Sequence, residues 1–568
     1  MTYCLYSALT SFRLIIMGVS LASILLLSGT APAMPPHPDV QAKVERGEIP
    51  DPNFAAKRLS QAGPTPIDAP SAQRQTALTG PFKALCILVD FSDKTAQAAV
   101  RKFDTLIFVD RQGTVRDYYQ EVSFGQVDLV TVDLPSSLGW QRAPQTYAYY
   151  VDGNYGVESP YPHNSQKLCE DLVDLMDSRI DFSSYDNDGN GFVDVVMIVH
   201  AGRGAEYTGS PNDMWSHKWS IMPRPCDGVS VSDYTVTPEY WGSPGDMTIG
   251  VFCHELGHAF GLVDLYDTDN SSYGTGYWSL MSSGSWNGGM GNSPAHPDAW
   301  SRTRLNWTTP VNITSNATAV SIPSVETSGL VYRLWTSGAA GREYFIVENR
   351  QKTGYDAALP ASGLLIWHVD ENNYHNDYEW YPGHTDYGHY MVALEQADNQ
   401  YSLEKKVSYG DGGDPYPGNT VNTAFSPTSA PGSGGYGGSS SLVAITNISP
   451  SGPQMTADFA VSLASGNDGD DDPTPIPLIA LEQNYPNPFN PTTCFRYTLP
   501  VAGHITITIF DILGRRVNRI ISGYHQAGTF TAAWHGEDER GHPAPTGVYL
   551  YELATDEEKA VRKMLLLR

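Results

Sequence analysis

The sequence predicts a multidomain protein of the α/β plus β class, in which an α/β domain is followed by an all-β region and a small C-terminal domain. Up to residue 307, continuous apolar runs alternate with helical patterns, as in sheets covered by helices. Short alternating segments separated by Gly, Pro, Asn and Asp continue to residue 463, a pattern typical of all-β folds. An acidic, Pro-containing linker at 464–480 then precedes the final domain.

Length and charge narrow the class of protein. At 568 residues the chain is too long for one core, and its apolar fraction of 41% is sufficient to form several. The net charge of -27 argues against nucleic acid and anionic membrane surfaces, which require a basic face. Such an excess of carboxylates suits an exported protein that binds hard cations.

The first 33 residues are predicted to be a signal peptide. Arg13 supplies a positive charge, Leu14–Leu27 is apolar, and Ala31-Pro32-Ala33 fits a cleavage site. The apolar run is shorter than the ~20 residues that span a bilayer, so a membrane anchor is disfavoured. No other stretch is apolar enough to span.

Residues 34–80 are rich in Pro, Ala, Gln and charge, and we interpret them as a propeptide or flexible leader. The segment contains no cysteine, so a thiolate cannot cap a metal from here. A carboxylate such as that of Asp51 could do so, although nothing singles it out.

Within the predicted α/β domain at 81–307, four elements stand out. Two apolar runs suggest buried strands, Ala84–Phe91 and Phe192–His200. Apolar residues at helical spacing predict helices over Val115–Val122 and over 247–260.

The region at 308–463 and the final domain at 481–568 are predicted to consist of strands. The clearest candidates in the first are Tyr344–Val347, Gly363–Val369 and Tyr390–Leu394. In the second, Ile505–Ile509 alternates strictly between Ile and Thr, as expected of a strand with one buried face.

Five cysteines remain once Cys4 leaves with the signal peptide, and they contain no C-x-x-C pair: Cys86, Cys169, Cys226, Cys253 and Cys494. This spacing disfavours a zinc-cysteine site. After export it is compatible with one or two disulfides, whose pairing the sequence does not reveal.

A metal site is predicted on the helix at 247–260. His254 and His258 lie four residues apart, so both imidazoles project from one face and can share a cation. Glu255 is placed to accept a proton from a water that zinc acidifies to a pKa of about 7. The alternative is an amphipathic helix whose histidines serve only packing.

The third ligand is predicted to be Asp264. No glutamate occurs between His258 and Glu326, which makes a glutamate ligand from a later helix improbable. Gly261 can end the helix in the left-handed conformation and return Asp264 to the metal, with Asp267 as the main rival. The pattern resembles that of metzincins with aspartate replacing the third histidine, and Met281 would then lie in the methionine turn beneath the metal.

Residues 81 to about 463 resemble the immune inhibitor A-like peptidases of the M6 family. The motifs that carry this resemblance are HELGHAFGLVDLYDTD at 254–269, WSLMSSGSW at 278–286, VRDYYQEVSFGQ at 115–126, MIVHAG at 197–202, WSHKWS at 215–220 and EYFIVENRQ…GLLIWHVDE across 343–371. The resemblance implies a metzincin-like zinc endopeptidase, secreted as a zymogen, that attacks extracellular proteins and peptides.

Two features depart from the family pattern. Val263 stands where relatives often have proline, a change that should not disturb ligation. The methionine turn has no tyrosine two residues after Met281 to stabilise an oxyanion, so His217 and Tyr277 are weak candidates for that role.

A calcium loop is predicted at Asp186–Asp194. Asp186, Asp188, Asn190 and Asp194 carry oxygen ligands around Gly191, although Met197 replaces the glutamate of an EF-hand. The alternative is an Asx-rich turn without metal. The stretch DGGDPYPG at 411–418 is a weaker candidate of the same kind.

The last ninety residues or so resemble the type A sorting domain of the type IX secretion system. This resemblance rests on NYPNPFNP at 484–491, DILGR at 511–515 and TGVYL at 546–550. It implies a small Ig-like β-sandwich and a protein exported through the periplasm to the outer surface or medium, with the secretion machinery as a partner. We expect a monomer. A rival hypothesis is a catalytically idle surface adhesin built on a peptidase scaffold.

Overall fold

A computed structural model describes residues 33–49, 79–336, 340–384, 388–436, 440–461 and most of 480–568 (480–481, 484, 487–499, 503–512, 514–525, 528–555 and 559–568). The predicted signal peptide up to residue 32, Asp51 and the predicted linker at 464–480, apart from its last residue, lie outside these residues. Among the described helices, none has the length and apolar character needed to cross a membrane.

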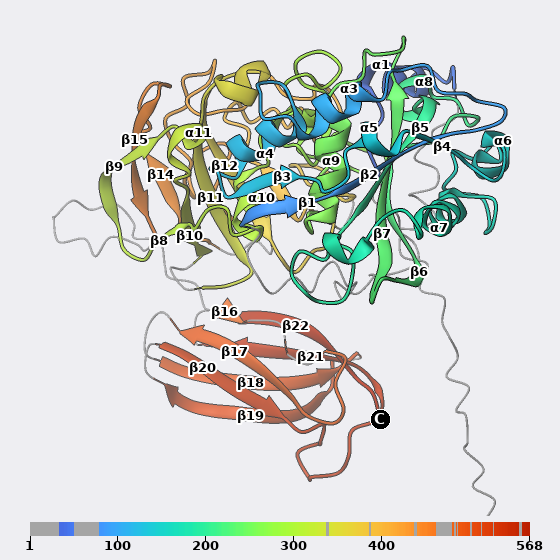
Figure 1. The fold of residues 1–568 in the computed structure, drawn as a ribbon. Coiled ribbons are helices and arrows are strands. Elements are labelled where there is room, and N and C mark those ends of the chain that lie inside the picture. Colours follow the sequence, from blue (N-terminus) through green and yellow to red (C-terminus); the bar gives the residue numbers. More distant parts are fainter. Residues whose placement is uncertain are drawn as a thin grey trace, which may run out of the picture.

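The N-terminal half is built on a five-stranded sheet of order β4-β2-β5-β7-β6 (Figure 1). Its strands are β2 (Leu85–Asp90), β4 (Trp140–Arg142), β5 (Val196–Arg203), β6 (His217–Cys226) and β7 (Val229–Tyr240). Neighbouring strands run parallel except for β6, which pairs antiparallel with β7 at the edge of the sheet.

Helices cover both faces of this sheet. Alternate residues of β2 enter two cores: Cys86 and Leu88 contact the core that contains α4 (Val115–Val122) and α9 (Gly250–Ala259), whereas Leu85 and Ile87 contact the core of α7. This two-sided burial confirms the predicted strand. The remaining helices of this half are α1 (Pro38–Glu45), α3 (Arg101–Phe103), α5 (Pro135–Leu138), α6 (Tyr147–Val151), α7 (Ser165–Met176), α8 (Ala205–Thr208) and α10 (Ala299–Arg304).

The predicted helices at 115–122 and 247–260 are confirmed as α4 and α9. The strand predicted from Phe192 begins only at Val196. Phe192 forms an isolated bridge with Ser230 because the preceding loop holds the chain in turns. Two short strands, β1 (Gly80–Lys83) and β3 (Val127–Val130), form a separate parallel pair.

The region beyond residue 307 consists mainly of two sheets that share a core. The first has the order β13-β12-β11-β10-β8: β8 (Val311–Ile313), β10 (Tyr332–Trp335), β11 (Glu343–Arg350), β12 (Gly363–Asp370) and β13 (Val392–Leu394). The second contains β9 (Ala317–Pro323), β14 (Ala444–Thr446) and β15 (Gln454–Ala460), and one short helix, α11 (Val325–Ser328), lies between β9 and β10. The other face of β11 and β12 joins the core of α9, so one core extends across both regions.

The C-terminal region contains a sheet of β16 (Ala480–Leu481), β17 (Thr493–Leu499) and β20 (Gly528–Trp534). A second sheet contains β19 (Arg516–His525), β18 (Gly503–Asp511), β21 (Gly547–Ala554) and β22 (Lys559–Leu566). Side chains of both sheets form one core. The strand predicted at Ile505–Ile509 lies within β18 and buries all three isoleucines.

The five cysteines of the described residues are all free, so the expectation of a disulfide is wrong for this structure. Cys86 and Cys253 lie in one core, and Cys169 and Cys226 lie in another. Burial raises the pKa of all four thiols, so they remain protonated and pack as small apolar groups.

His368 on β12 is a buried cation. Its Nδ1 lies 3.0 Å from Glu395 Oε1 and its Nε2 lies 3.1 Å from Glu343 Oε1. Burial opposes its protonation, but the hydrogen bonds and charges of the two carboxylates raise the pKa of His368 from 6.5 to about 9.

Replacing His368 with Gln is therefore expected to destabilise the protein in a pH-dependent way. The folded pKa lies above the unfolded value, so the stabilisation is complete below about pH 6.5 and is lost as the pH rises through 9. It amounts to about 3 kcal/mol at most. Urea unfolding of both proteins between these pH values measures it, and a difference that does not shrink with rising pH would contradict the assignment.

Candidate metal centre and catalytic cleft

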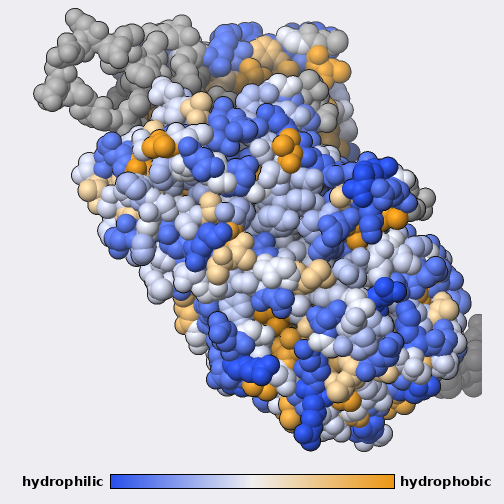
Figure 2. Space-filling view, turned by 90° about the horizontal axis from the view of Figure 1, so that it is seen from above, coloured by the Kyte–Doolittle hydropathy of each residue, from blue (hydrophilic) through white to orange (hydrophobic). Residues whose placement is uncertain are grey.

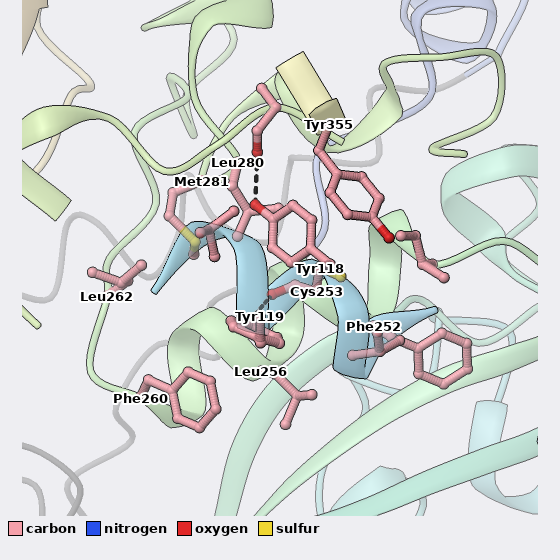
Figure 3. Close-up of a cluster of buried hydrophobic side chains, with 14 of the residues drawn as sticks. Tyr118, Tyr119, Phe252, Cys253, Leu256, Phe260, Leu262, Leu280, Met281 and Tyr355 are labelled. Atoms are coloured by element: carbon pink, nitrogen blue, oxygen red, sulfur yellow. Dashed lines mark hydrogen bonds between the residues drawn. The ribbon is translucent and has the colours of Figure 1, made fainter. Parts of the chain in front are cut away.

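The helix α9 is buried along its whole length, and its neighbours hold it in place (Figure 3). Tyr119 of α4 donates a hydrogen bond to the Cys253 carbonyl at 2.5 Å. Gly257 faces the Met281 sulfur so closely that a Cβ atom would collide with it. Met281 thus packs directly against the helix that carries the two histidines.

The chain reverses after α9 at Gly261, whose φ of 101° favours glycine. The Gly261 amide donates to the His258 carbonyl, and the Leu262 amide donates to the Gly257 carbonyl. This turn returns Asp264 to the helix.

His254, His258 and Asp264 converge on one point. The two Nε2 atoms lie 3.2 Å apart, and Asp264 Oδ1 lies 3.2 Å from that of His254 and 3.1 Å from that of His258. Three zinc ligands at about 2.0 Å in tetrahedral directions are about 3.3 Å from one another. The separations and the donor types therefore fit zinc.

The outer nitrogens of both histidines face carbonyls. Nδ1 of His254 lies 3.0 Å from the Leu280 carbonyl, and Nδ1 of His258 lies 3.0 Å from that of Leu262. We infer that Nδ1 carries the proton in each ring, because a carbonyl can only accept. This tautomer leaves each Nε2 lone pair free for a metal.

Burial opposes the ionisation of Asp264, but protonated rings at His258 and His254 would bring its pKa down to about 2. When the rings are neutral, a cation at the same point would favour the ionised carboxylate in the same way.

Glu255 is fully buried, and neither carboxylate oxygen has a hydrogen-bond partner by geometry among the described residues. Burial raises the pKa of Glu255 well above its ordinary range, and the charge of Asp264 adds to this effect. The backbone amide of Met34 opposes it, which places residue 34 beside the carboxylate. A desolvated carboxylate of this kind can hold a proton near neutral pH.

The rival ligand Asp267 lies in a different environment. Its carboxylate accepts hydrogen bonds from the Ser272 amide at 2.7 Å and from the hydroxyls of Ser271 and Ser272. Burial raises the pKa of Asp267 to about 8. The structure groups Asp264, not Asp267, with the two histidines.

Tyr266 is a residue of the cleft that the sequence reasoning missed. Its ring lies 6.4 Å from that of His254. Burial raises the pKa of Tyr266 well above its ordinary value, with contributions from Asp264 and Glu255. Tyr266 stands two residues after Asp264, the predicted third ligand, and this short spacing could have indicated that it lies near the metal.

The junction between the predicted signal peptide and the leader lies beside the metal centre in an extended conformation. Ala33 forms an antiparallel bridge with His217 at the start of β6, and the Met34 amide donates to the Ser216 carbonyl at 3.1 Å. Tyr266 donates its hydroxyl hydrogen to the Ala33 carbonyl at 2.6 Å, and Trp215 Nε1 donates to the Met34 carbonyl at 2.7 Å.

The next residues extend this docking. Trp286 Nε1 donates to the Pro35 carbonyl at 3.0 Å, and the amide of His37 donates to the Glu206 carbonyl at 2.8 Å. Met34, Pro35 and Pro36 are buried. Helix α1 then packs beside α8 (Figure 1).

His217 and Tyr277, the two candidates for the oxyanion role, both have side chains that contact other residues of the protein. His217 is fully buried, and its ring nitrogens engage the Trp215 carbonyl at 2.7 Å and the Ser165 hydroxyl at 2.8 Å, which leaves neither for a substrate. Burial lowers the pKa of His217 to about 4. Tyr277 stacks on Tyr409, with ring centres 5.1 Å apart.

In the loop at 186–194, the acidic oxygens bind backbone amides. Asp186 accepts from the amides of Asn190 at 3.0 Å and Gly191 at 2.9 Å, and Asp194 accepts from that of Asn187 at 2.7 Å. Asp188 and Asn190 make further turns of the same kind. These contacts are those of an Asx-rich turn, so they give calcium at this loop no added support.

Comparison with known proteins yields two family matches. Residues 113–309 match the catalytic domain of immune inhibitor A peptidase M6, and residues 493–559 match the FlgD Ig-like domain. A crystal structure of FLGD from P. aeruginosa is 30% identical, covering 13% of this chain and 59% of that one, with a TM-score of 0.12.

Two curated relatives are similar to part of the chain. Immune inhibitor A of Bacillus thuringiensis is 34% identical over an alignment of 205 positions that covers 31% of this chain and 29% of the relative. Pre-pro-metalloprotease PrtV of Vibrio cholerae is 28% identical over 278 residues, 39% of this chain and 29% of the relative. The alignments thus span under a third of each relative. These matches support a metallopeptidase of the M6 family.

Proposed function

We propose that this protein is a secreted zinc endopeptidase with a metzincin-like catalytic domain. The observation that carries the proposal is the convergence of His254 Nε2, His258 Nε2 and Asp264 Oδ1 beside the buried Glu255. A zinc ion held by these three ligands would supply a Lewis acid for the substrate carbonyl and lower the pKa of the attacking water.

Glu255 is the general base in this proposal. Its buried carboxylate accepts the proton of the attacking water and delivers it to the leaving amine. Burial favours the first step, since it raises the affinity of this carboxylate for a proton, and the amine takes the proton in the second step because it is the more basic group.

Tyr266 is proposed as the group that stabilises the carbonyl oxygen. In the structure its hydroxyl donates to the Ala33 carbonyl, while the next amide, that of Met34, lies beside Glu255. In the uncleaved chain, the Ala33–Met34 peptide, which is also the predicted signal-peptide junction, supports a model for a bound substrate, with its carbonyl at the donor and its nitrogen at the base.

The contacts of residues 34–37, which remain after cleavage at Ala33, support secretion as a zymogen. A leader that occupies the substrate position excludes protein substrates until it is released or cleaved. Helix α1 holds the leader there: Val40 is buried, and Glu45 lies 3.4 Å from the Lys406 ammonium. The relative PrtV is named a pre-pro-metalloprotease, which is in keeping with such a segment.

Unseating α1 is expected to activate the unprocessed protein. Val40→Asp places a charge in an apolar contact, so the leader should dissociate from the cleft and hydrolysis of casein should rise severalfold before any cleavage. Quenched-casein fluorescence, with intact mass to verify that the chain is uncut, measures this effect.

Arg46→Asp is the matched control, because Arg46 is exposed at the end of α1 and pairs only with Glu48 in the described residues. It should leave latency unchanged. The activity of Val40→Asp must disappear with a zinc chelator and return with zinc. Persistence of hydrolysis in the chelator would refute the metallopeptidase proposal, and equal latency of both variants would refute the leader proposal alone.

Three finer proposals rest on sequence motifs. The C-terminal domain is proposed as an Ig-like sorting domain of the type IX system, and export through the periplasm to the surface or medium follows from it. Calcium at the loop of Asp186 and a monomeric state are proposed on the same footing. The rival hypothesis is an idle adhesin on a peptidase scaffold. The site does not favour it, because the three metal ligands and Glu255 are all present.

A further inference from the structure

A second group of possible metal ligands lies outside the zinc site, in the loops that follow β13. Carboxylate oxygens of Asp398, Asp411 and Asp414 lie within 4.8 Å of one another. We propose that these three aspartates form a calcium site, which goes beyond the peptidase function and does not depend on it.

Asp414 provides the main evidence. The residue is 1% exposed, and its Oδ2 accepts hydrogen bonds from Trp278 Nε1 at 2.9 Å and from the Asp411 amide at 2.8 Å. Its Oδ1 is buried without a hydrogen-bond partner in the described part of the chain. A buried carboxylate oxygen without a partner is costly, and a bound cation would satisfy it.

The charge balance points to the same conclusion. Among the described residues, no Lys, Arg or His forms an ion pair with any of the three aspartates. Burial raises the pKa of Asp414 to about 7 and also raises that of Asp398, and the neighbouring aspartates add to both effects. Three like charges at this spacing repel one another unless a cation lies between them.

The ligand chemistry selects the cation. All three groups supply carboxylate oxygen, the donor that calcium prefers, and no sulfur or imidazole is included in the group. Gly413 lies against the carboxylates of Asp398 and Asp411, where a Cβ atom would collide with Asp398 Oδ2 and lie 3.0 Å from Asp411 Oδ1. Glycine therefore lets the loop approach its own ligands closely.

The site is joined directly to the methionine turn. Trp278, the partner of Asp414, stands three residues before Met281, and the Tyr277 amide donates to the Tyr409 carbonyl at 2.7 Å. Tyr409 also stacks on Tyr273, with ring centres 3.8 Å apart. Calcium at the three aspartates would thus brace the turn that lies beneath the zinc ligands.

The test is calcium binding to the full-length protein carrying Glu255→Ala, which prevents self-cleavage. Isothermal titration with CaCl₂ should show one fewer site, or binding at least about tenfold weaker, when Asp398→Asn and Asp411→Asn are added. The matched control is Asp186→Asn with Asp188→Asn, which should retain this site. Unchanged binding in the first variant overturns the proposal.

Terbium luminescence keeps the proposal testable if the double variant does not fold. Because Trp278 contacts a proposed ligand, excitation at the red edge of tryptophan absorption should sensitise bound Tb³⁺. Trp278→Phe should lose most of this emission, and calcium should displace it in the parent protein. Emission that is absent in the parent, or that survives Trp278→Phe unchanged, would show that the aspartates share protons instead of a cation.

Discussion

Glu255→Gln is expected to lower the rate of casein hydrolysis by about 10²–10⁴-fold, the range typical of a lost general base. Glutamine has nearly the same shape but cannot accept the proton of the attacking water. The substitution should leave the zinc content near one per chain by elemental analysis, since Glu255 is not among the three ligand atoms that converge.

The matched pair Asp264→Ala and Asp267→Ala distinguishes the loss of the metal from the loss of the general base. Only the first should release zinc, because the carboxylate of Asp267 is engaged by Ser271 and Ser272. Near wild-type hydrolysis by Glu255→Gln would refute its role as the base. Loss of zinc from Asp267→Ala with retention in Asp264→Ala would reverse the ligand assignment.

Arg350→Met is expected to destabilise the protein by about 3–5 kcal/mol, the cost of leaving buried charges without a partner. Arg350 lies fully buried on β11 and forms a bidentate pair with Asp356 at 2.6 and 2.7 Å. It also lies 3.3 Å from Glu348, which pairs with the buried Arg302 of α10. Removal of the arginine leaves Asp356 with the His296 amide at 2.9 Å and the His296 imidazole at 3.9 Å.

Arg342→Met provides the control for this change, since Arg342 is exposed just before β11. Its effect should stay within about 0.5 kcal/mol. Urea unfolding of both variants gives the comparison. Equal stability of Arg350→Met and the parent would mean that the pair contributes no net stabilisation.

The surface of the molecule is mainly hydrophilic, as expected of a strongly acidic chain. Figure 2 shows hydrophilic residues over most of the face, with hydrophobic residues scattered in small groups. A net charge of -27 favours solubility and suits the binding of cations in acidic loops.

Much of the metal centre was predictable because its ligands are local. His254, Glu255 and His258 lie on one helix, and the helical period places the two imidazoles on the same face. Gly261 and Asp264 follow within one reversal of the chain, so glycine at a positive φ is enough to predict the return. Buried strands such as β2 were equally predictable, since a continuous apolar run has few alternatives.

Other parts of the site depend on contacts between distant segments, which no local pattern encodes. The docking of Ala33 and Met34 against Tyr266 and Trp215 joins residues about two hundred positions apart. Asp398 joins the aspartates at 411 and 414 only because two loops meet. His217 was misassigned because its motif does not reveal that the ring faces Ser165 in a second core.

The proposed zinc ligands and general base therefore follow from the order of residues along a single helix and turn, where covalent geometry leaves little freedom. The occupant of the cleft, the donor at Tyr266 and the cluster around Asp414 follow from packing. These features require the whole chain to fold, because their partners approach one another only when the cores form.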